Sequence, residues 1–337
     1  MTGRGSPPIF VCGVPRSGTT WLARVLARAP GCRYVHEPDN HHHRPFALRA
    51  KRGLGPFPAM DLDGRHRSDR FTLLWEAAFA GAEGRGGRLE ARLRRRLMAS
   101  PSALKDGLVG AQDAHGYALL RPTLSLVQRL ARPPRPRRST TSGRVVVKSV
   151  QAMLSLEWIT GRWHPITVLI QREPLNVVAS WLELGWDDLG PIPREVEEHL
   201  CRRWGIDPLP EPRSLVERVA WRVGFLASAV LDARKRLAAR DEGGIVFVRH
   251  ADLCARPFET FRALFERLDL EWNEEVEAFV RESNRPGFGY DTHRVWSEQP
   301  TRWRSLEPSV RRRVEVVLAR FPALTGDETA NVPQAQR

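Results

Sequence analysis

The sequence lacks the long apolar segments that enter or cross a membrane. No run of about 18 apolar residues occurs in the 337 residues, so no membrane span is expected. The first eight residues are polar and include two glycines and two prolines, so no signal peptide is expected either. The chain has only four cysteines, which form neither a CxxC pair nor a zinc-binding spacing. We therefore expect reduced thiols and a cytoplasmic location.

Lysine is scarce, although the chain is strongly basic. The formal net charge is +14, from 53 Lys and Arg against 39 Asp and Glu, yet only four of the basic residues are lysines. This arginine preference extends over the whole chain and weakens the argument from charge alone for a nucleic-acid partner. A positive field still favours an anionic ligand, such as a phosphorylated nucleotide. With 42% hydrophobic and 27% charged residues, the composition is that of a soluble globular protein.

Short apolar runs alternate with helical patterns along the chain. Strands are expected over 9–12, 32–36, 145–147, 166–170 and 245–248. Helices are expected over 19–29, 71–82, 88–99 and 116–131, from about 152, from 174, over 214–239, and over 256–267, 273–282 and 308–320. The alternation predicts an α/β fold, a three-layer α/β/α arrangement with a central parallel sheet, in which ligands bind at the carboxyl ends of the strands.

The remaining stretches set the expected domain organisation. We expect one domain over residues 1–325 and a flexible tail over 326–337. Two stretches without a clear period, 38–70 and 187–213, are expected to be loops that build an acceptor pocket or a lid. A Pro-rich surface loop is expected over 132–143.

The turn after the first strand has the form of a phosphate-binding loop. It reads G-V-P-R-S-G-T-T over residues 13–20 and lies between an apolar strand and a helix. Backbone amides and the helix N-terminus can bind an anion there, with Arg16 and the hydroxyls of Ser17, Thr19 and Thr20 adding charge and donors. Thr19 stands where a P-loop NTPase has lysine, and no strand ends in the aspartate that would hold magnesium. This weakens the kinase alternative; a glycine turn without a ligand is the other.

This loop resembles that of a known enzyme family. The segment P-R-S-G-T-T-W-L over residues 15–22 is similar to the 5′-phosphosulfate loop of sulfotransferases that use 3′-phosphoadenosine 5′-phosphosulfate (PAPS). The resemblance implies a P-loop-like fold and a role for Trp21 in stacking on adenine, although an ordinary core position is the alternative for this tryptophan. The residues that it implies hold the 5′-phosphosulfate are Arg16, Ser17, Gly18, Thr19 and Thr20.

A second segment resembles the part of the same family that binds the 3′-phosphate. Arg172 follows an apolar strand, and Ser180 comes eight residues later, about 2.2 turns along the next helix. An arginine offers a fixed fork of donors to a phosphate. Glu173 stands where the family usually has aspartate. Further candidates for the 3′-phosphate are Arg294, Arg302 and Arg304, although the Arg-Lys-Gly triplet of many members is absent.

The resemblance also suggests catalytic residues. Lys148 follows the middle strand and is expected to stabilise charge near the sulfuryl group, unless it is merely a surface lysine. Val150 stands where cytosolic members of the family have their histidine base. The segment Y-V-H-E-P over 34–38 resembles the Glu-Pro of glycan-type members, so Glu37 is the first candidate base and His36 the second. Alternatively, Glu37 only pairs with an arginine near the phosphate loop.

The sequence thus predicts a bacterial, cytoplasmic enzyme of the sulfotransferase class. We expect it to move a sulfuryl group from PAPS to a hydroxyl of a saccharide, glycolipid or secondary metabolite by in-line transfer, with no metal and no nucleic-acid partner. His41–His43 cannot all face one ion and are expected on a solvated or acceptor-contacting loop. The first alternative is a P-loop small-molecule kinase, and the second is a nucleic-acid-binding protein with a basic surface. The prediction requires that the two anion-binding segments lie close enough for one nucleotide to touch both.

Overall fold

The structure is a computed structural model. It describes residues 6–60, 68–82, 143–186, 192–211, 213–240, 244–287 and 293–325, with the single positions 95, 99, 105 and 131. Four predicted segments lie wholly or almost wholly outside these residues: the helices over 88–99 and 116–131, the surface loop over 132–143 and the tail over 326–337.

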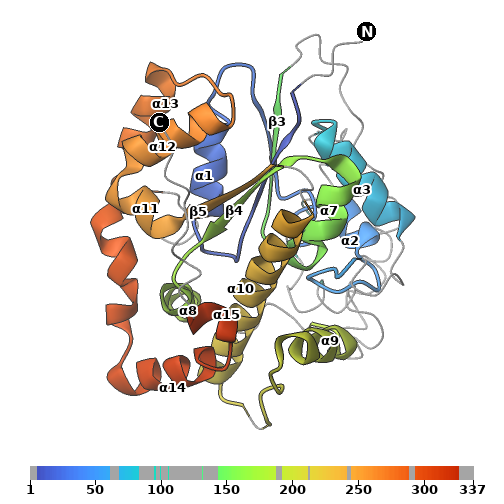
Figure 1. The fold of residues 1–337 in the computed structure, drawn as a ribbon, viewed down its shortest axis with the longest axis vertical. Helices are drawn as coiled ribbons and strands as arrows, with labels where there is room; N and C mark the ends of the chain where they lie inside the picture. Colours follow the sequence, from blue (N-terminus) through green and yellow to red (C-terminus); the bar gives the residue numbers. More distant parts are fainter. Residues whose placement is uncertain are drawn as a thin grey trace.

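The core of the fold is a five-stranded sheet in which every pairing is parallel (Figure 1). The strand order is β2-β3-β1-β4-β5. The strands are β1 (Ile9–Cys12), β2 (Arg33–His36), β3 (Val145–Ser149), β4 (Ile166–Gln171) and β5 (Ile245–Arg249). All four residues of the central strand β1 are buried, which explains why it reads as a continuous apolar run. The predicted α/β class and parallel sheet are confirmed.

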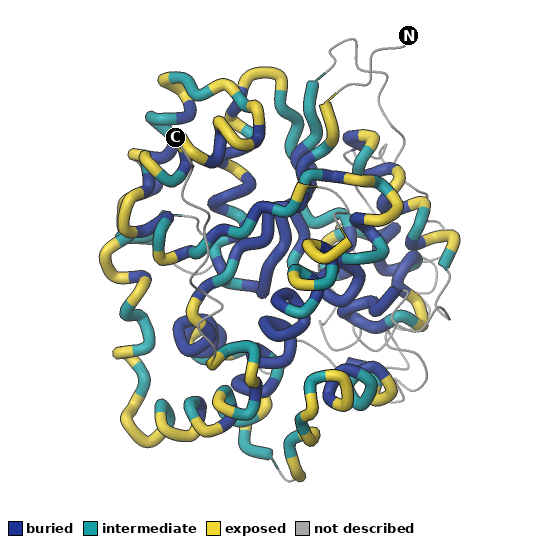
Figure 2. The backbone as a smooth tube through the Cα atoms, in the orientation of Figure 1, coloured by how far each residue is buried: buried dark blue, intermediate teal, exposed yellow. Residues whose placement is uncertain are grey.

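Helices cover both faces of the sheet. Successive side chains of β1 point to opposite faces, so each face is apolar and is buried by its own set of helices. Ile9 and Val11 pack with α1 (Thr19–Leu26), α11 (His250–Ala255), α12 (Pro257–Arg267) and α13 (Glu274–Glu282). Phe10 and Cys12 belong to the larger core on the other face. That core is built from α2 (Pro45–Ala50), α3 (Asp69–Phe79), α7 (Leu156–Trp163), α8 (Pro174–Glu183), α9 (Arg194–Trp204), α10 (Leu215–Ala239), α14 (Pro308–Leu318) and α15 (Pro322–Thr325). The strands lie in the buried centre of the molecule (Figure 2).

The long helix α10 begins where the sequence predicted. Ser214 accepts a hydrogen bond from the backbone of Glu217, whose carboxylate accepts one from the backbone of Ser214, so the capping box is formed. Fourteen of its residues are buried, which fits a helix in the centre of a layer rather than at its surface. None of the described helices is long and apolar enough to cross a membrane.

Two stretches that the sequence predicted as loops contain helices. The segment 187–213 holds α9, and the segment 38–70 holds α2 and the start of α3. The α9 helix buries Val196, Leu200 and Cys201, so one narrow apolar stripe anchors it while its other faces carry charge. The prediction was wrong here because the many charged residues and nearby prolines concealed that stripe. The predicted helix over 19–29 also ends earlier, at Leu26.

Candidate active site

The phosphate-like loop lies at the carboxyl end of β1, as its sequence indicated. The N-cap of α1 is Gly18, which has a φ of 91° and no side chain to obstruct it. A Cβ atom at Gly18 would meet Cδ2 of His250 at 2.5 Å, so both the backbone conformation and the close packing require glycine. Arg16 also has a positive φ, 75°, which is uncommon for a residue with a side chain and is found where function or packing imposes it.

The two segments predicted to bind an anion touch one another. The guanidinium of Arg172 donates from Nη1 to the carbonyl oxygen of Arg16 at 3.1 Å. The Arg16 side chain in turn donates from Nε to Oγ of Ser180, also at 3.1 Å. The loop after β1 and the β4–α8 junction are therefore joined by two hydrogen bonds through Arg16. They lie close enough for one ligand to reach both.

Arg172 is nearly buried, with 8% of its surface exposed, yet it has no ion pair among the described residues. Nη2 donates to the carbonyl oxygen of Gln299 at 3.1 Å and to Oε1 of its side chain at 3.3 Å. The third donor atom, Nε, is buried without a partner in the described structure. A buried cation with an unused donor is costly unless an anion completes its surroundings.

The charges around Arg172 show the same shortage of negative partners. Burial, together with the positive charges of Arg302, Arg16 and Arg294, lowers the pKa of its guanidinium to about 9. Arg302 forms an ion pair with Glu183 on α8 while its own Nε is buried without a partner in the described structure. The late arginine predicted from the sequence thus lies at this site, and the site as a whole carries excess positive charge.

The segment η3 (Trp296–Ser305) covers this site through two residues that the sequence analysis missed. One is Gln299, described above. The other is Asn176 in the first turn of α8, which donates from Nδ2 to the carbonyl oxygen of Pro300 at 3.0 Å and accepts from the backbone of Trp303 at 2.9 Å. An asparagine in the first turn of a largely apolar helix was the available signal for this contact.

Trp21 lies in an aromatic cluster beside the loop rather than on the open surface. Its ring stacks on Trp296 at 6.1 Å between centroids and meets Phe261 edge-on at 5.2 Å. Its Nε1 is buried without a partner in the described structure. The tryptophan is therefore part of the core on the α1 face and also adjoins η3, the segment that covers Arg172.

On the other side of the loop, Lys148 and Glu37 form an ion pair. Lys148 is almost completely buried and lies opposite His36 in the register of β2 and β3. The backbone amide of Glu37 donates to the carbonyl oxygen of Lys148 at 2.8 Å, and Asn40 donates to the second oxygen of the Glu37 carboxylate. The pairing of Glu37 with an arginine near the loop, the alternative from the sequence, is not the arrangement found: its cation is Lys148.

The protonation states of the two candidate bases differ. Burial alone would raise the pKa of Glu37, but the Lys148 ammonium, His36 and the hydrogen bonds from Lys148 and Asn40 outweigh it and lower the pKa to about 2. Burial lowers the pKa of His36 to about 4, and nearby Lys148 contributes in the same direction. At neutral pH, Glu37 is therefore ionised and His36 is neutral. The Tyr34 hydroxyl lies 2.7 Å from Nδ1 of His36 and fixes the ring.

The histidine run that follows is not uniformly solvated, contrary to expectation. His41 is fully buried, with Nδ1 at 3.3 Å from both Nζ of Lys51 and Oε1 of Gln151, whereas His43 is exposed. In the part of the chain that the structure describes, no group of His, Cys, Asp or Glu could hold a metal ion.

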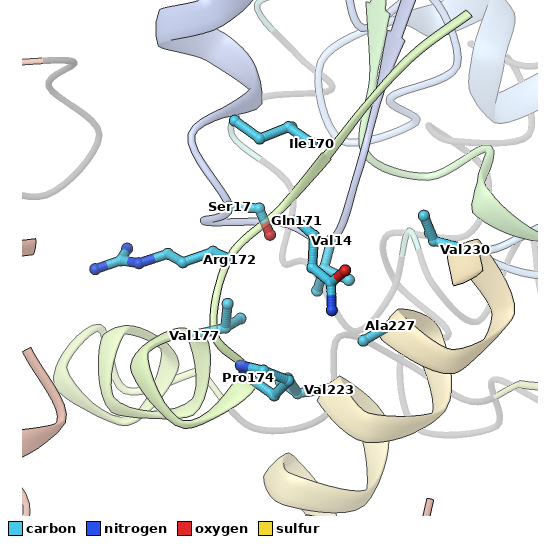
Figure 3. Close-up of a pocket in the computed structure, with 10 residues that line it drawn as sticks. All are labelled: Val14, Ser17, Ile170, Gln171, Arg172, Pro174, Val177, Val223, Ala227 and Val230. Atoms are coloured by element: carbon cyan, nitrogen blue, oxygen red, sulfur yellow. The ribbon is translucent and has the colours of Figure 1, made fainter. Parts of the chain in front are cut away.

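Side chains at the end of β4 alternate between the two faces of the sheet (Figure 3). Arg172 points away from α10, toward the site described above, while Gln171 points toward α10. A small, mainly apolar cavity lies on the α10 side, lined by Val14, Ser17, Ile170, Gln171, Arg172, Pro174, Val177, Val223, Ala227 and Val230. Ser17 and Arg172 both border this cavity, while the Arg172 guanidinium extends away from it (Figure 3).

The first quarter of the chain is similar to a known protein family. Residues 7–85 match the model described as the sulfotransferase family. The matched segment covers about a quarter of the chain. It contains β1, the loop with Arg16 and Gly18, and Glu37. No curated protein sequence matches the chain significantly.

Several solved sulfotransferase structures are similar to the chain at low identity. They include a sulfotransferase domain from the curacin biosynthetic pathway, at 13% identity and TM-score 0.44, over 94% of this chain and 99% of that one. Mouse sulfotransferase SULT7A1, complexed with PAP, is at 10% and 0.40, over 97% and 87%. Sulfotransferase STF9 from Mycobacterium avium is at 14% and 0.39, over 95% and 78%.

Proposed function

We propose that the protein transfers a sulfuryl group from PAPS to the hydroxyl of a small-molecule or glycan acceptor. The observation that carries this proposal is the contact between the family-matched loop and the β4–α8 junction, in which Arg16 links Arg172 to Ser180. A donor with phosphate groups at both ends of an adenosine needs two anion sites that adjoin. The match to the sulfotransferase family supports sulfuryl transfer, rather than another use of such a nucleotide.

The surroundings of Arg172 fit the 3′-phosphate of such a donor. An anion there would accept from the unused Nε of Arg172 and offset the positive charges that depress its pKa. Ser180 would contribute its hydroxyl. At the other end, Arg16 and the amides from Gly18 to Thr20 would hold the 5′-phosphosulfate at the N-terminus of α1.

The order of the strands suggests how the donor would be oriented along the carboxyl edge of the sheet. Across the carboxyl edge, β1 with its loop lies between β4, which ends at Arg172, and β3, which contains Lys148. A nucleotide with its 3′-phosphate at Arg172 and its 5′-phosphate on the loop would therefore present its sulfuryl end toward Lys148 and Glu37. In this arrangement Lys148, on β3, and Glu37, just after β2, would face the sulfuryl group.

Transfer then requires charge stabilisation and a proton acceptor. The acceptor oxygen forms a bond to sulfur while the bond from sulfur to the bridging phosphate oxygen breaks, leaving adenosine 3′,5′-bisphosphate. Lys148 would stabilise the charge on that leaving oxygen. The acceptor's proton would go to Glu37 or to His36. The negative charge of a bound donor offsets the positive charge of Lys148 and so raises the pKa of both Glu37 and His36. This chemistry uses no metal ion.

The proposed acceptor class and cellular location follow from the resemblance of the motifs to the sulfotransferase family. We propose a saccharide, glycolipid or secondary metabolite as acceptor, near the segments that follow β2 and precede α10, and a bacterial cytoplasm as the setting. The two strand ends beside the loop supply Lys148 and Arg172 where a kinase would need a magnesium-binding aspartate.

The test is a comparison of nucleotides followed by a transfer assay. Isothermal titration calorimetry should show that adenosine 3′,5′-bisphosphate binds at least tenfold more tightly than adenosine 5′-monophosphate, without magnesium. Sulfur-35-labelled PAPS, incubated with a panel of hydroxylated metabolites, should then yield a labelled product. Equal affinity for the two nucleotides, or turnover of Mg-ATP with phosphate transfer, would overturn the proposal in favour of the kinase alternative.

A further inference from the structure

Behind the Glu37–Lys148 pair lies a buried carboxylate that the proposed reaction does not use. Asp39 has no exposed surface, so it cannot reach a substrate. Its two oxygens each lie 2.8 Å from Oγ of Ser149, whose single proton they share. Burial raises the pKa of Asp39, while Lys51 and the Ser149 hydrogen bond oppose that shift. A buried carboxylate held this closely has a defined partner rather than an accidental one.

This contact spans the same two chain segments as the ion pair. Ser149 directly follows Lys148 at the end of β3, and Asp39 lies two residues after Glu37 at the end of β2. Glu37, two residues before Asp39, adopts a positive φ of 42°. A residue with a side chain keeps this conformation only when its surroundings hold it there. The Asp39–Ser149 contact is placed to hold that turn.

Ser149 is itself fixed on the side away from Asp39. Its Oγ accepts hydrogen bonds from the backbone amides of Gln151 at 3.0 Å and Ala152 at 3.2 Å. The Gln151 side chain accepts from Nζ of the fully buried Lys51 at 2.7 Å. The serine is therefore a rigid anchor, and the chain after Glu37 is fastened to it.

We propose that Asp39 and Ser149 are positioning residues: their hydrogen bond sets the Glu37 carboxylate against Lys148 before any substrate binds. This inference rests on the proposed function. Neither residue touches the reacting atoms, and both act through the pair next to them. Loss of the contact should lower turnover about 10- to 100-fold, because small displacements of catalytic groups are costly. Nucleotide affinity should change less than threefold, since Arg172 and Ser180 lie on the other side of the loop.

The variant that tests this is Ser149→Ala, with Ser155→Ala as its matched control. Ser155 is another buried serine close by, whose hydroxyl donates to the carbonyl oxygen of Pro58 at 2.5 Å and has no link to Glu37. Both changes delete a buried hydroxyl and should lower the melting temperature to a similar degree. Only Ser149→Ala should lower kcat, and Ser149→Thr, which restores the hydroxyl, should recover most of it. If Ser149→Ala does not fold, Ser149→Cys gives the same comparison with the side-chain volume retained.

A second measurement reads the geometry without any activity. The chain has four lysines, so acetylation by acetic anhydride can be followed at each one by mass spectrometry. Lys148 should react slowly in the wild type relative to the exposed Lys235, and several-fold faster in Ser149→Ala but not in Ser155→Ala. If the wild type transfers no sulfate, the proposed function fails while this labelling still tests the contact. Equal effects of the two alanine variants on labelling, or on turnover, would overturn the inference.

Discussion

The two charged clusters beside the phosphate-like loop differ in how their charges are balanced. Around Arg172, the neighbouring charges are other guanidinium groups, which help to lower its pKa to about 9, and one donor atom is unused in the described structure. On the other side, Lys148 meets Glu37 directly, and Asn40 satisfies the second oxygen of that carboxylate. Arg172 thus has no anionic partner among the described residues, whereas Lys148 has one in Glu37.

This difference indicates that one cluster contributes to nucleotide binding and the other to the transfer step. A cluster with excess positive charge gains free energy when a phosphate arrives, so it supplies affinity. A pair that is already neutral gains little from a new anion, because Lys148 must share its charge between the ligand and Glu37. We therefore expect substitutions near Arg172 to change binding and substitutions in the Glu37–Lys148 pair to change turnover.

The largest effect is expected from Glu37→Gln. The amide keeps the shape of the side chain but cannot take up the acceptor's proton, so kcat should fall by roughly 10²- to 10⁴-fold, the usual contribution of a general base. Calorimetric affinity for adenosine 3′,5′-bisphosphate should stay within a few-fold of the wild type. Full activity of this variant would assign the base to His36 or to another group, and a large loss of affinity would contradict the division itself.

Lys148→Ala should have the next largest effect. Loss of the ammonium removes stabilisation of the leaving oxygen, and kcat should fall on the order of 10²- to 10³-fold. The change also leaves the Glu37 carboxylate without its cation, which is destabilising by about 3–5 kcal/mol when a buried pair is broken. The double variant Lys148→Ala with Glu37→Gln separates these effects, because it should regain melting temperature but not turnover. Unchanged turnover in Lys148→Ala would remove this lysine from the mechanism.

Arg172→Ala should act on affinity instead. A charge-assisted hydrogen bond to a phosphate contributes about 1.5–3 kcal/mol, so adenosine 3′,5′-bisphosphate should bind roughly 10- to 100-fold more weakly. The affinity for adenosine 5′-monophosphate should barely change, since that nucleotide has no 3′-phosphate. Arg28→Ala removes an exposed arginine paired with Glu275 and is the matched control for lost positive charge. If Arg172→Ala weakened both nucleotides equally, the arginine would not distinguish the 3′-phosphate.

The fold was predictable from the sequence because its strands are short, apolar and buried on both faces. Each of the five strands overlaps its predicted range. The α8 helix begins at the predicted proline, and α10 begins at the predicted capping box. The α9 helix was not predictable in the same way, because its buried face consists of only Val196, Leu200 and Cys201. Charge and proline content outweighed that narrow pattern.

The site was predictable only as far as local motifs reached. Arg16, Arg172 and Ser180 stood in segments with a recognisable spacing, and the structure brings them together. Gln299 and the Asp39–Ser149 contact carry no such spacing, because each joins residues more than 100 positions apart. Contacts of that kind arise from the packing of distant segments and leave no local pattern to find.

The smallest effect concerns the pH dependence of stability, and it sharpens the contrast within the second cluster. His36 has a pKa of about 4 in the folded protein, against about 6.5 for an unperturbed histidine. The unfolded chain therefore binds a proton between these values while the folded protein does not, so the free energy of unfolding falls as the pH is lowered from about 6.5 to 4.

His36→Gln should remove part of that dependence, roughly 1–3 kcal/mol across the window, measured by urea denaturation at several pH values. The remaining slope should persist, because burial also holds the pKa of His41 and of His250 well below the ordinary range. If His36→Gln left the slope intact, the pKa of the His36 ring would be the same in the folded protein as in the unfolded chain, and the ring would be charged below about pH 6.5. The Glu37–Lys148 pair would then face a second cation, and the neutral, self-contained character that distinguishes this cluster from the one around Arg172 would be lost.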